Sequence, residues 1–233
     1  MTGNDPLHPA FTLAVMLAAT LMFLGVDLAL HESVAVIFKE GHTIELMSAV
    51  FLAFAAGLWW VTGADDMRGR QWHIPAILTL MTLRELDFDK RFTSEGVLQL
   101  RLYSGPSPLW EKLLGLAVIA LILICGWRLL TITMPRWWAG LRAGLPSSWL
   151  AGLAALLVVV AKSLDGLDRK LADFGVILVP EYGTLAGRVE ELLELAAFMM
   201  LVQALVYFLH CRRRITATRL VPAPYAAFLP HWH

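Results

Sequence analysis

Charged residues are scarce in this chain of 233 residues. Only 16% are Asp, Glu, Lys or Arg, whereas soluble domains average about 25%. Hydrophobic residues make up 58%, and the mean hydropathy is +0.64. A soluble fold of this composition would have too little polar surface to cover its apolar residues. The shortage of charge therefore excludes an ordinary soluble domain and indicates that lipid surrounds most of the chain.

An excess of charge of either sign is also lacking, and cysteine is rare. The 19 basic and 19 acidic residues balance, so no overall positive field attracts nucleic acid. The two cysteines, Cys125 and Cys211, have no Cys-x-x-Cys spacing. They provide neither a disulfide framework nor a metal motif. We expect both to be small residues buried in the membrane.

The sequence lacks the motifs of common cofactor and hydrolase sites. No segment carries a His-x-x-x-His face, and no histidine lies in the middle of an apolar segment. A zinc hydrolase and a bis-histidine haem protein are therefore not indicated. Neither a Gly-x-Ser-x-Gly elbow nor a phosphate-binding loop is present. We expect no metal ion and no cofactor, whereas an acid–base mechanism using paired carboxylates stays open.

Apolar segments are what the chain has in abundance. There are six, at residues 10–30, 46–61, 72–83, 113–132, 149–161 and 195–209. The first is long enough to span a bilayer as a helix, at about 30 Å. The third and fifth have only 12 and 13 uncharged residues, so they either end inside the bilayer or continue through the charges after them. We predict the second case: a single all-α domain over residues 1–233, a polytopic membrane bundle of about six transmembrane helices.

The connections between these segments are mostly short and polar. Residues 134–146 contain two prolines and read as a link, and residues 165–188 are mixed. The longer stretch 87–108 fits an amphipathic surface helix or a strand. Residues 1–9 carry no Lys or Arg, which predicts a retained first helix rather than a cleaved signal peptide.

The residues that flank the apolar segments indicate how the chain is oriented in the membrane. Counting Lys and Arg on the two sides does not decide it, but Arg212, Arg213 and Arg214 directly follow the last segment, where the positive-inside bias is strong. We therefore place both termini in the cytoplasm. Abundant Ala, Leu and Arg with few Lys suggest a bacterium, and hence the bacterial inner membrane. Seven tryptophans form an interfacial belt at the level of the termini: Trp59, Trp60, Trp72, Trp127, Trp137, Trp138 and Trp149.

A charge pattern recurs at the other ends of the segments. Basic residues Arg84 and Lys162 follow the third and fifth segments, each with an acid three residues later, which on a helix shares its face. Acidic residues stand at the start of the second and sixth segments, where the helix dipole stabilises a negative charge. Six spans would bring all these charges to one depth. The candidate charged network is Glu45, Arg84, Glu85, Asp87, Lys162, Asp165, Glu190, Glu191 and Glu194, with Asp27 and His31 as further contributors.

Three interpretations of this pattern stay open. The charges could flank helices in the headgroup region, tie helices together, or form a functional site for an ion, a proton or a substrate. Basic residues at this depth need counter-charges. We predict that Arg84 and Lys162 pair with carboxylates of other helices, first among them Glu45, Glu191 and Glu194.

The run from Arg84 to Phe88, Arg-Glu-Leu-Asp-Phe at the end of an apolar segment, resembles uncharacterised bacterial multi-pass inner-membrane proteins with a similar helix end. The resemblance implies a membrane location and brings no assigned activity.

The function expected from the sequence is a multi-pass integral membrane protein whose outer-leaflet charged network moves or senses an ion, a proton or a small solute. One alternative is a membrane-embedded enzyme acting on a lipid or an envelope precursor, and another is a non-catalytic accessory or assembly subunit. We favour the absence of catalysis. The expected partners are the lipid bilayer and other membrane subunits or a second copy of the chain, but no nucleic acid.

Overall fold

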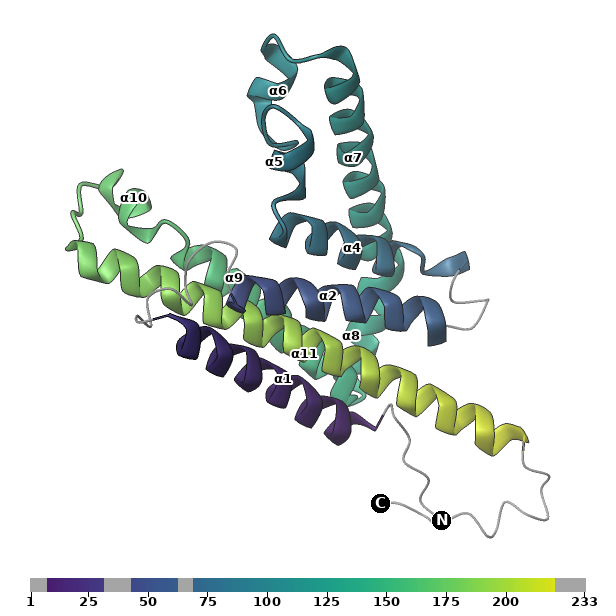
Figure 1. Ribbon diagram of the computed structural model, residues 1–233. Helices are drawn as coiled ribbons and strands as arrows, with labels where there is room; N and C mark the ends of the chain where they lie inside the picture. Colours follow the sequence, from purple (N-terminus) through teal and green to yellow (C-terminus); the bar gives the residue numbers. More distant parts are fainter. Residues whose placement is uncertain (1–7, 32–42, 63–68, 221–233) are drawn as a thin grey trace.

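The computed structural model describes residues 8–31, 43–62 and 69–220, without the side chains of residues 89, 90 and 213–220. Within these ranges the regular secondary structure is entirely helical (Figure 1). The helices are α1 (Pro9–Leu30), α2 (Thr43–Thr62), α4 (His73–Glu85), α5 (Phe88–Phe92), α6 (Leu100–Ser104), α7 (Leu109–Arg128), α8 (Met134–Arg142), α9 (Pro146–Leu164), α10 (Leu167–Ala172) and α11 (Pro180–Leu220). The all-α prediction is confirmed for this part of the chain.

Among the described residues, five helical stretches are long and apolar enough to cross a membrane. They are Pro9–Leu30, Thr43–Thr62, Leu109–Arg142, Pro146–Leu164 and Pro180–Arg212. The fifth apolar segment of the sequence does continue through its charged residue, because α9 includes Lys162. The third also continues through the first charges after it, because α4 includes Arg84 and Glu85. Helix α4 ends at Glu85 after 13 residues, about 20 Å.

The core lies between α2 and α11. Buried residues of α2 such as Leu52 and Trp59 pack against residues of α11 such as Val202 and Val206, with Met16 of α1 added from the side. About half of each helix is buried inside the protein, whereas α1, α7 and α9 bury less than a fifth of their spanning residues. The two central helices are therefore held by protein contacts, and the outer three present mainly apolar surface to their surroundings.

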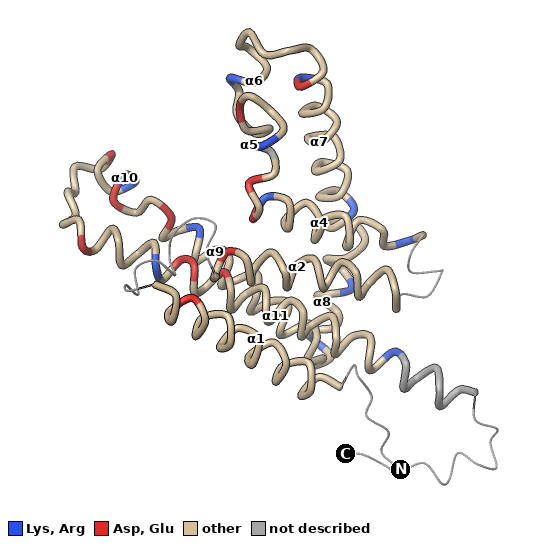
Figure 2. The backbone as a smooth tube through the Cα atoms, in the orientation of Figure 1, with Lys and Arg blue, Asp and Glu red and all other residues tan. Residues whose placement is uncertain are grey.

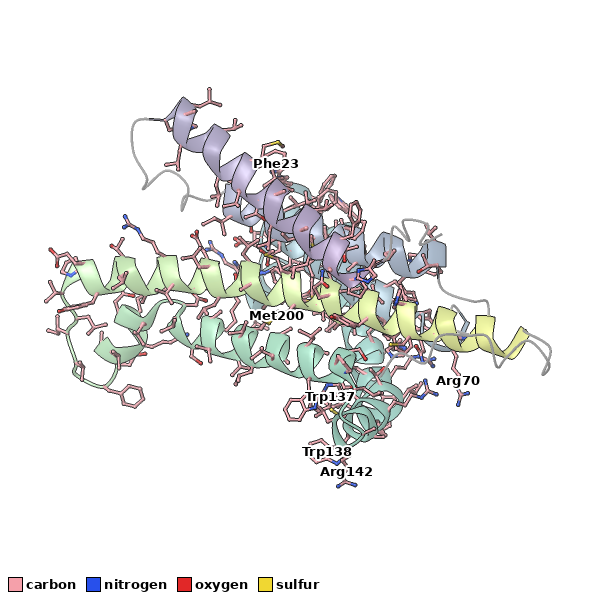
Figure 3. The ribbon with its side chains drawn as sticks, turned by 90° about the horizontal axis from the view of Figure 1, so that it is seen from below. Phe23, Arg70, Trp137, Trp138, Arg142 and Met200 are labelled. Carbon is pink, nitrogen blue, oxygen red and sulfur yellow. The ribbon has the colours of Figure 1, made fainter. Side chains whose placement is uncertain are left out.

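Helices α7 and α8 form one continuous rod that crosses the direction of the other long helices. Figure 1 shows it lengthwise beside the bundle, and Figure 3, turned by 90°, shows it end-on. A π-helical turn at Leu129–Thr133 joins the two helices. This π-helical turn precedes Pro135. Because a proline has no backbone N–H, it cannot donate a hydrogen bond to the carbonyl one helical turn earlier. The prediction of a link at residues 134–146 was wrong, because a proline is tolerated in the first turn of α8.

The turn from α8 to α9 is tight. Gly144 has a φ of +70°, a left-handed conformation that ends α8. The indole Nε1 of Trp137 donates a hydrogen bond to the carbonyl of Ser148 at 2.8 Å. Gly140 lies so close to Ser148 that an added Cβ would collide with its hydroxyl. A glycine at this crossing therefore lets α8 approach α9 closely.

The charges separate along the bundle. Among the described residues, every Asp and Glu lies toward the end where α2 begins or on the α5–α7 arm (Figure 2). We call the α2-start end the acidic end. The opposite, basic end carries Arg70 and Arg142, and Trp137 and Trp138 lie beside Arg142 (Figures 2 and 3). Arg128 also lies there, since its guanidinium donates a hydrogen bond to the carbonyl of Arg70 at 2.7 Å. The Arg142 guanidinium lies 5.4 Å from the ring centre of Trp138. The tryptophans at this end agree with the predicted tryptophan belt on the side away from the charged network.

Residues 86–108 fold over the start of α7 and include α5 and α6. We call this segment the cap. Val97 and Leu102 of the cap are buried. The Tyr103 hydroxyl donates a hydrogen bond to the carbonyl of Val97 at 2.6 Å. Of the two structures expected for residues 87–108, the helical one is present, as two short helices, and the described part contains no strand.

Candidate functional site

Lys162 is the residue on which two acids of α11 converge. Its Nζ lies 2.6 Å from Oε1 of Glu194 and 3.1 Å from Oε1 of Glu190. The two glutamates are four residues apart, so they share one face of α11, which packs along α9. Their side chains are 12% and 14% exposed, whereas that of Lys162 is 51% exposed. The predicted pairing of Lys162 with Glu194 is present, and Glu190 is a second partner.

Further acids surround this pair. Glu85 at the end of α4 lies within electrostatic range of Lys162 and Glu194. Glu45 in the first turn of α2 lies within range of both Glu85 and Glu191. Helices α2, α4, α9 and α11 therefore bring charged side chains to one place, as the sequence predicts. The name charged network is kept for the residues of this place, namely Glu45, Arg84, Glu85, Lys162, Glu190, Glu191 and Glu194.

Arg84 differs from Lys162 in its environment. Its side chain is exposed, and in the described part of the chain no carboxylate lies within ion-pair distance of its guanidinium. The pairing predicted for Arg84 with Glu45, Glu191 or Glu194 is therefore not seen. Lys162 already holds Glu194, one of the three acids predicted for Arg84. Arg84 reaches only into electrostatic range of its neighbour Glu85.

Asp87 and Asp165 do not share helix faces with the basic residues before them. Helix α4 ends at Glu85, and Asp87 adopts a φ of +47° as the chain turns into the cap. Helix α9 ends at Leu164, and Asp165 comes after it in a non-helical conformation, exposed but within electrostatic range of Glu190. The prediction of shared faces was wrong because both helices end before these acids.

The acids of α11 are also placed differently from the prediction. Glu190, Glu191 and Glu194 were expected to open a helix, but α11 begins ten residues earlier, at Pro180. The helix dipole acts only within the first turn, so it stabilises Glu45 but not these three residues. Two of them, Glu190 and Glu194, lie in ion-pair contact with Lys162 instead.

Asp27 and His31 form a separate contact at the acidic end. His31 Nδ1 lies 3.0 Å from Oδ1 of Asp27, and the other carboxylate oxygen accepts a hydrogen bond from the Thr43 hydroxyl at 2.7 Å. Since Asp27 belongs to α1 and Thr43 opens α2, this contact holds the end of α1 against the start of α2. We assign it a structural role beside the charged network.

A cavity of about 770 Å³ opens next to the charged network. It lies in the angle where α7 crosses α4, and the cap, α9 and α11 complete its walls. Four of its lining residues are charged, namely Arg84, Glu85, Lys162 and Glu194. Apart from Thr93, the others are apolar: Ile77, Leu80, Met81, Leu83, Phe88, Phe92, Val97, Leu98, Trp110, Leu114, Val118, Ile122, Gly126, Val158 and Phe198. The cavity thus combines a large apolar wall with one cluster of charges.

The contacts that hold the cap in place were missed at the level of the sequence. Glu111 of α7 is 7% exposed, and its Oε2 accepts hydrogen bonds from the Ser94 backbone N–H at 2.8 Å and the Ser94 hydroxyl at 2.7 Å. The predicted apolar segment starts at residue 113 and the predicted link ends at residue 108, so Glu111 falls outside both. The usable signal was Pro108 followed three residues later by an acid, a pattern typical of a helix start.

Among the described residues no group of three or more His, Cys, Asp or Glu side chains is arranged to hold a metal ion. No protein-family model, no curated protein and no solved structure matches this chain. The cavity and the charged network alone therefore carry the functional conclusion.

Proposed function

We propose that this protein binds an amphipathic lipid, with the hydrocarbon tail in the cavity and the headgroup at the charged network. One observation carries the proposal: a single cavity has a continuous apolar wall and a cluster of four charged side chains. Its volume of about 770 Å³ falls within the roughly 300–1,000 Å³ of typical ligand pockets. An apolar lining with a few convergent polar groups holds a ligand by its apolar part and orients it by its polar part.

The same cavity supports ion or solute movement less well. A path for an ion through a membrane protein is lined by polar groups along its length, near mid-membrane. Here the charges are gathered at Arg84, Glu85, Lys162 and Glu194, and the walls contributed by α7 are apolar. A hydrated ion would lose its water along those walls without gaining ligands, whereas a hydrocarbon tail would be stabilised there.

The proposal includes a location in the inner membrane of a bacterium, six crossings and both termini in the cytoplasm. The sixth crossing would be α4, whose 13 residues are too short to span the hydrocarbon alone. A short α4 supports the lipid site, since its last turn then carries Arg84 and Glu85 at the hydrocarbon boundary, where a lipid headgroup can pair with them. Reporters that are active only in the periplasm, fused to either terminus, should both be inactive. Opposite readouts from the two fusions would rule out an even number of crossings.

Native mass spectrometry of the detergent-purified full chain tests lipid binding. Titration with dioleoyl phospholipids should show one lipid retained per chain. Gly126→Phe should weaken this binding at least tenfold, because Gly126 lines the cavity and a side chain built there meets open space. The matched control is Gly25→Phe on α1, where an added side chain also meets nothing.

Two results would contradict the proposal. One is the absence of a retained lipid of any class in the wild-type chain. The other is equal retention by the Gly126→Phe and Gly25→Phe variants, which would place the bound lipid on the outer surface rather than in the cavity.

A further inference from the structure

We infer that the lipid held in the cavity has a headgroup containing both a phosphate and a primary amine, as in phosphatidylethanolamine. This inference rests on the proposed function and names its ligand class. Its basis is two consecutive residues at the end of α4, Arg84 and Glu85, which line the cavity with opposite charges.

Arg84 offers a cation that the protein itself does not neutralise. Its side chain is exposed toward the cavity, and within the described residues it makes no ion pair or hydrogen bond. An arginine stays protonated in proteins, so at this depth it needs an anionic partner. Its planar fork matches the oxygens of a phosphate. The headgroup phosphate is the part of the ligand that fits this position.

Glu85 offers the complementary anion. It is partly buried at the cavity wall, and across the described part of the chain no basic side chain lies within ion-pair distance of it. Glu194 and Lys162 both lie within electrostatic range of Glu85, but they pair with each other and not with Glu85. A primary ammonium donates three hydrogen bonds and would be bound by a carboxylate in this setting.

The other two charges of the cavity do not compete for the ligand. Lys162 is held by Glu194 at 2.6 Å and by Glu190 at 3.1 Å, so its positive charge is already balanced. This leaves one open cation and one open anion on neighbouring residues, whose Cα atoms are about 3.8 Å apart. A phosphate joined to an amine by a short spacer matches that pair.

Two common headgroups fit less well. A purely anionic headgroup such as phosphatidylglycerol would bind Arg84 but meet the uncompensated Glu85. A choline headgroup has no N–H to donate and is held best by open aromatic faces. Of the aromatic residues that line the cavity, Phe88 and Phe92 pack against each other with ring centres 4.4 Å apart. The carboxylate of Glu85 offers a primary ammonium a hydrogen-bond acceptor that a choline headgroup cannot use.

The test is competition for the full chain in detergent between phosphatidylethanolamine, phosphatidylglycerol and phosphatidylcholine with identical dioleoyl tails, read by native mass spectrometry. The wild type should retain phosphatidylethanolamine about tenfold more tightly than either competitor, which corresponds to about 1.4 kcal/mol. Glu85→Gln should abolish that preference while total lipid retention persists, and Arg84→Gln should weaken all three lipids. Glu181→Gln, an exposed position at the start of α11, is the matched control and should leave the preference unchanged.

The outcomes separate this inference from the proposed function. A retained lipid that is lost in Gly126→Phe, together with no headgroup preference or a preference for phosphatidylcholine or phosphatidylglycerol, would overturn the inference alone. An unchanged preference in Glu85→Gln would do the same. Loss of every lipid from the wild type would overturn the proposed function as well.

Discussion

Lys162 of α9 and Glu194 of α11 face each other across 2.6 Å, and both line the cavity. This contact has two consequences. It joins the two helices at the acidic end, and it neutralises a lysine that would otherwise attract the anionic part of a ligand. The charged network therefore contains two different groups. In the structural half, Lys162 pairs with Glu190 and Glu194. In the open half, Arg84 and Glu85 line the cavity without an ion pair among the described residues.

The structural half should be visible in stability. Lys162→Met leaves Glu190 and Glu194 facing each other without a counter-charge. We expect the free energy of unfolding to fall by about 2 kcal/mol, between the ~1 kcal/mol of an exposed pair and the ~3 kcal/mol or more of a buried one. A double-mutant cycle with Glu194→Gln, measured by equilibrium unfolding in mixed micelles, isolates the pair. A coupling energy near zero would show that the contact does not join α9 to α11.

The open half should behave differently. Arg84→Gln removes no ion pair among the described residues, so the free energy of unfolding should change by no more than about 0.5 kcal/mol. Thermal unfolding in detergent, measured beside Lys162→Met, checks this. A loss of several kcal/mol in Arg84→Gln would mean that Arg84 holds the bundle together and is not open to a ligand.

Much of the fold can be predicted from composition and segment length alone. The apolar runs identify the long helices, and charges next to these runs mark the place where α2, α4, α9 and α11 meet. The sequence could not show that α4 has 13 residues while α9 has 19, since the two apolar runs are nearly equal in length. It could not show the cavity either, because the cavity depends on the angle at which α7 crosses α4. That angle is a property of packing between residues far apart in sequence.

The α8–α9 turn provides a test of packing. Gly140→Ala would push a methyl group into the Ser148 hydroxyl, so we expect a loss of about 1–3 kcal/mol in unfolding free energy. Gly57→Ala on α2 is the control: its added methyl meets nothing, and removing a helical glycine should stabilise by up to about 1 kcal/mol. Equal stability of the two variants would show that α8 and α9 are not in close contact at Gly140.

The cap should depend on Glu111. Glu111→Ala removes the acceptor of two Ser94 hydrogen bonds and leaves a backbone N–H without its partner, at a cost of about 1–3 kcal/mol. Because the cap is a small unit, we expect this loss to appear as local opening rather than as global unfolding. Hydrogen exchange of the Ser94 amide should become about tenfold faster or more. Unchanged exchange there, measured against amides in the core of α2, would contradict the assigned role of Glu111.

The most direct measurement of the central claim is photo-crosslinking with a phospholipid that carries a diazirine in its tail. After excess lipid is washed from the detergent-solubilised protein, irradiation and peptide mapping locate the retained tail. We predict labels on the cavity face of α7, at Leu114, Val118 or Ile122, and on Phe198 of α11, and their loss in Gly126→Phe but not in Gly25→Phe. Labels confined to the exposed apolar surface of α1, and equal in the two glycine variants, would contradict a lipid site in this cavity.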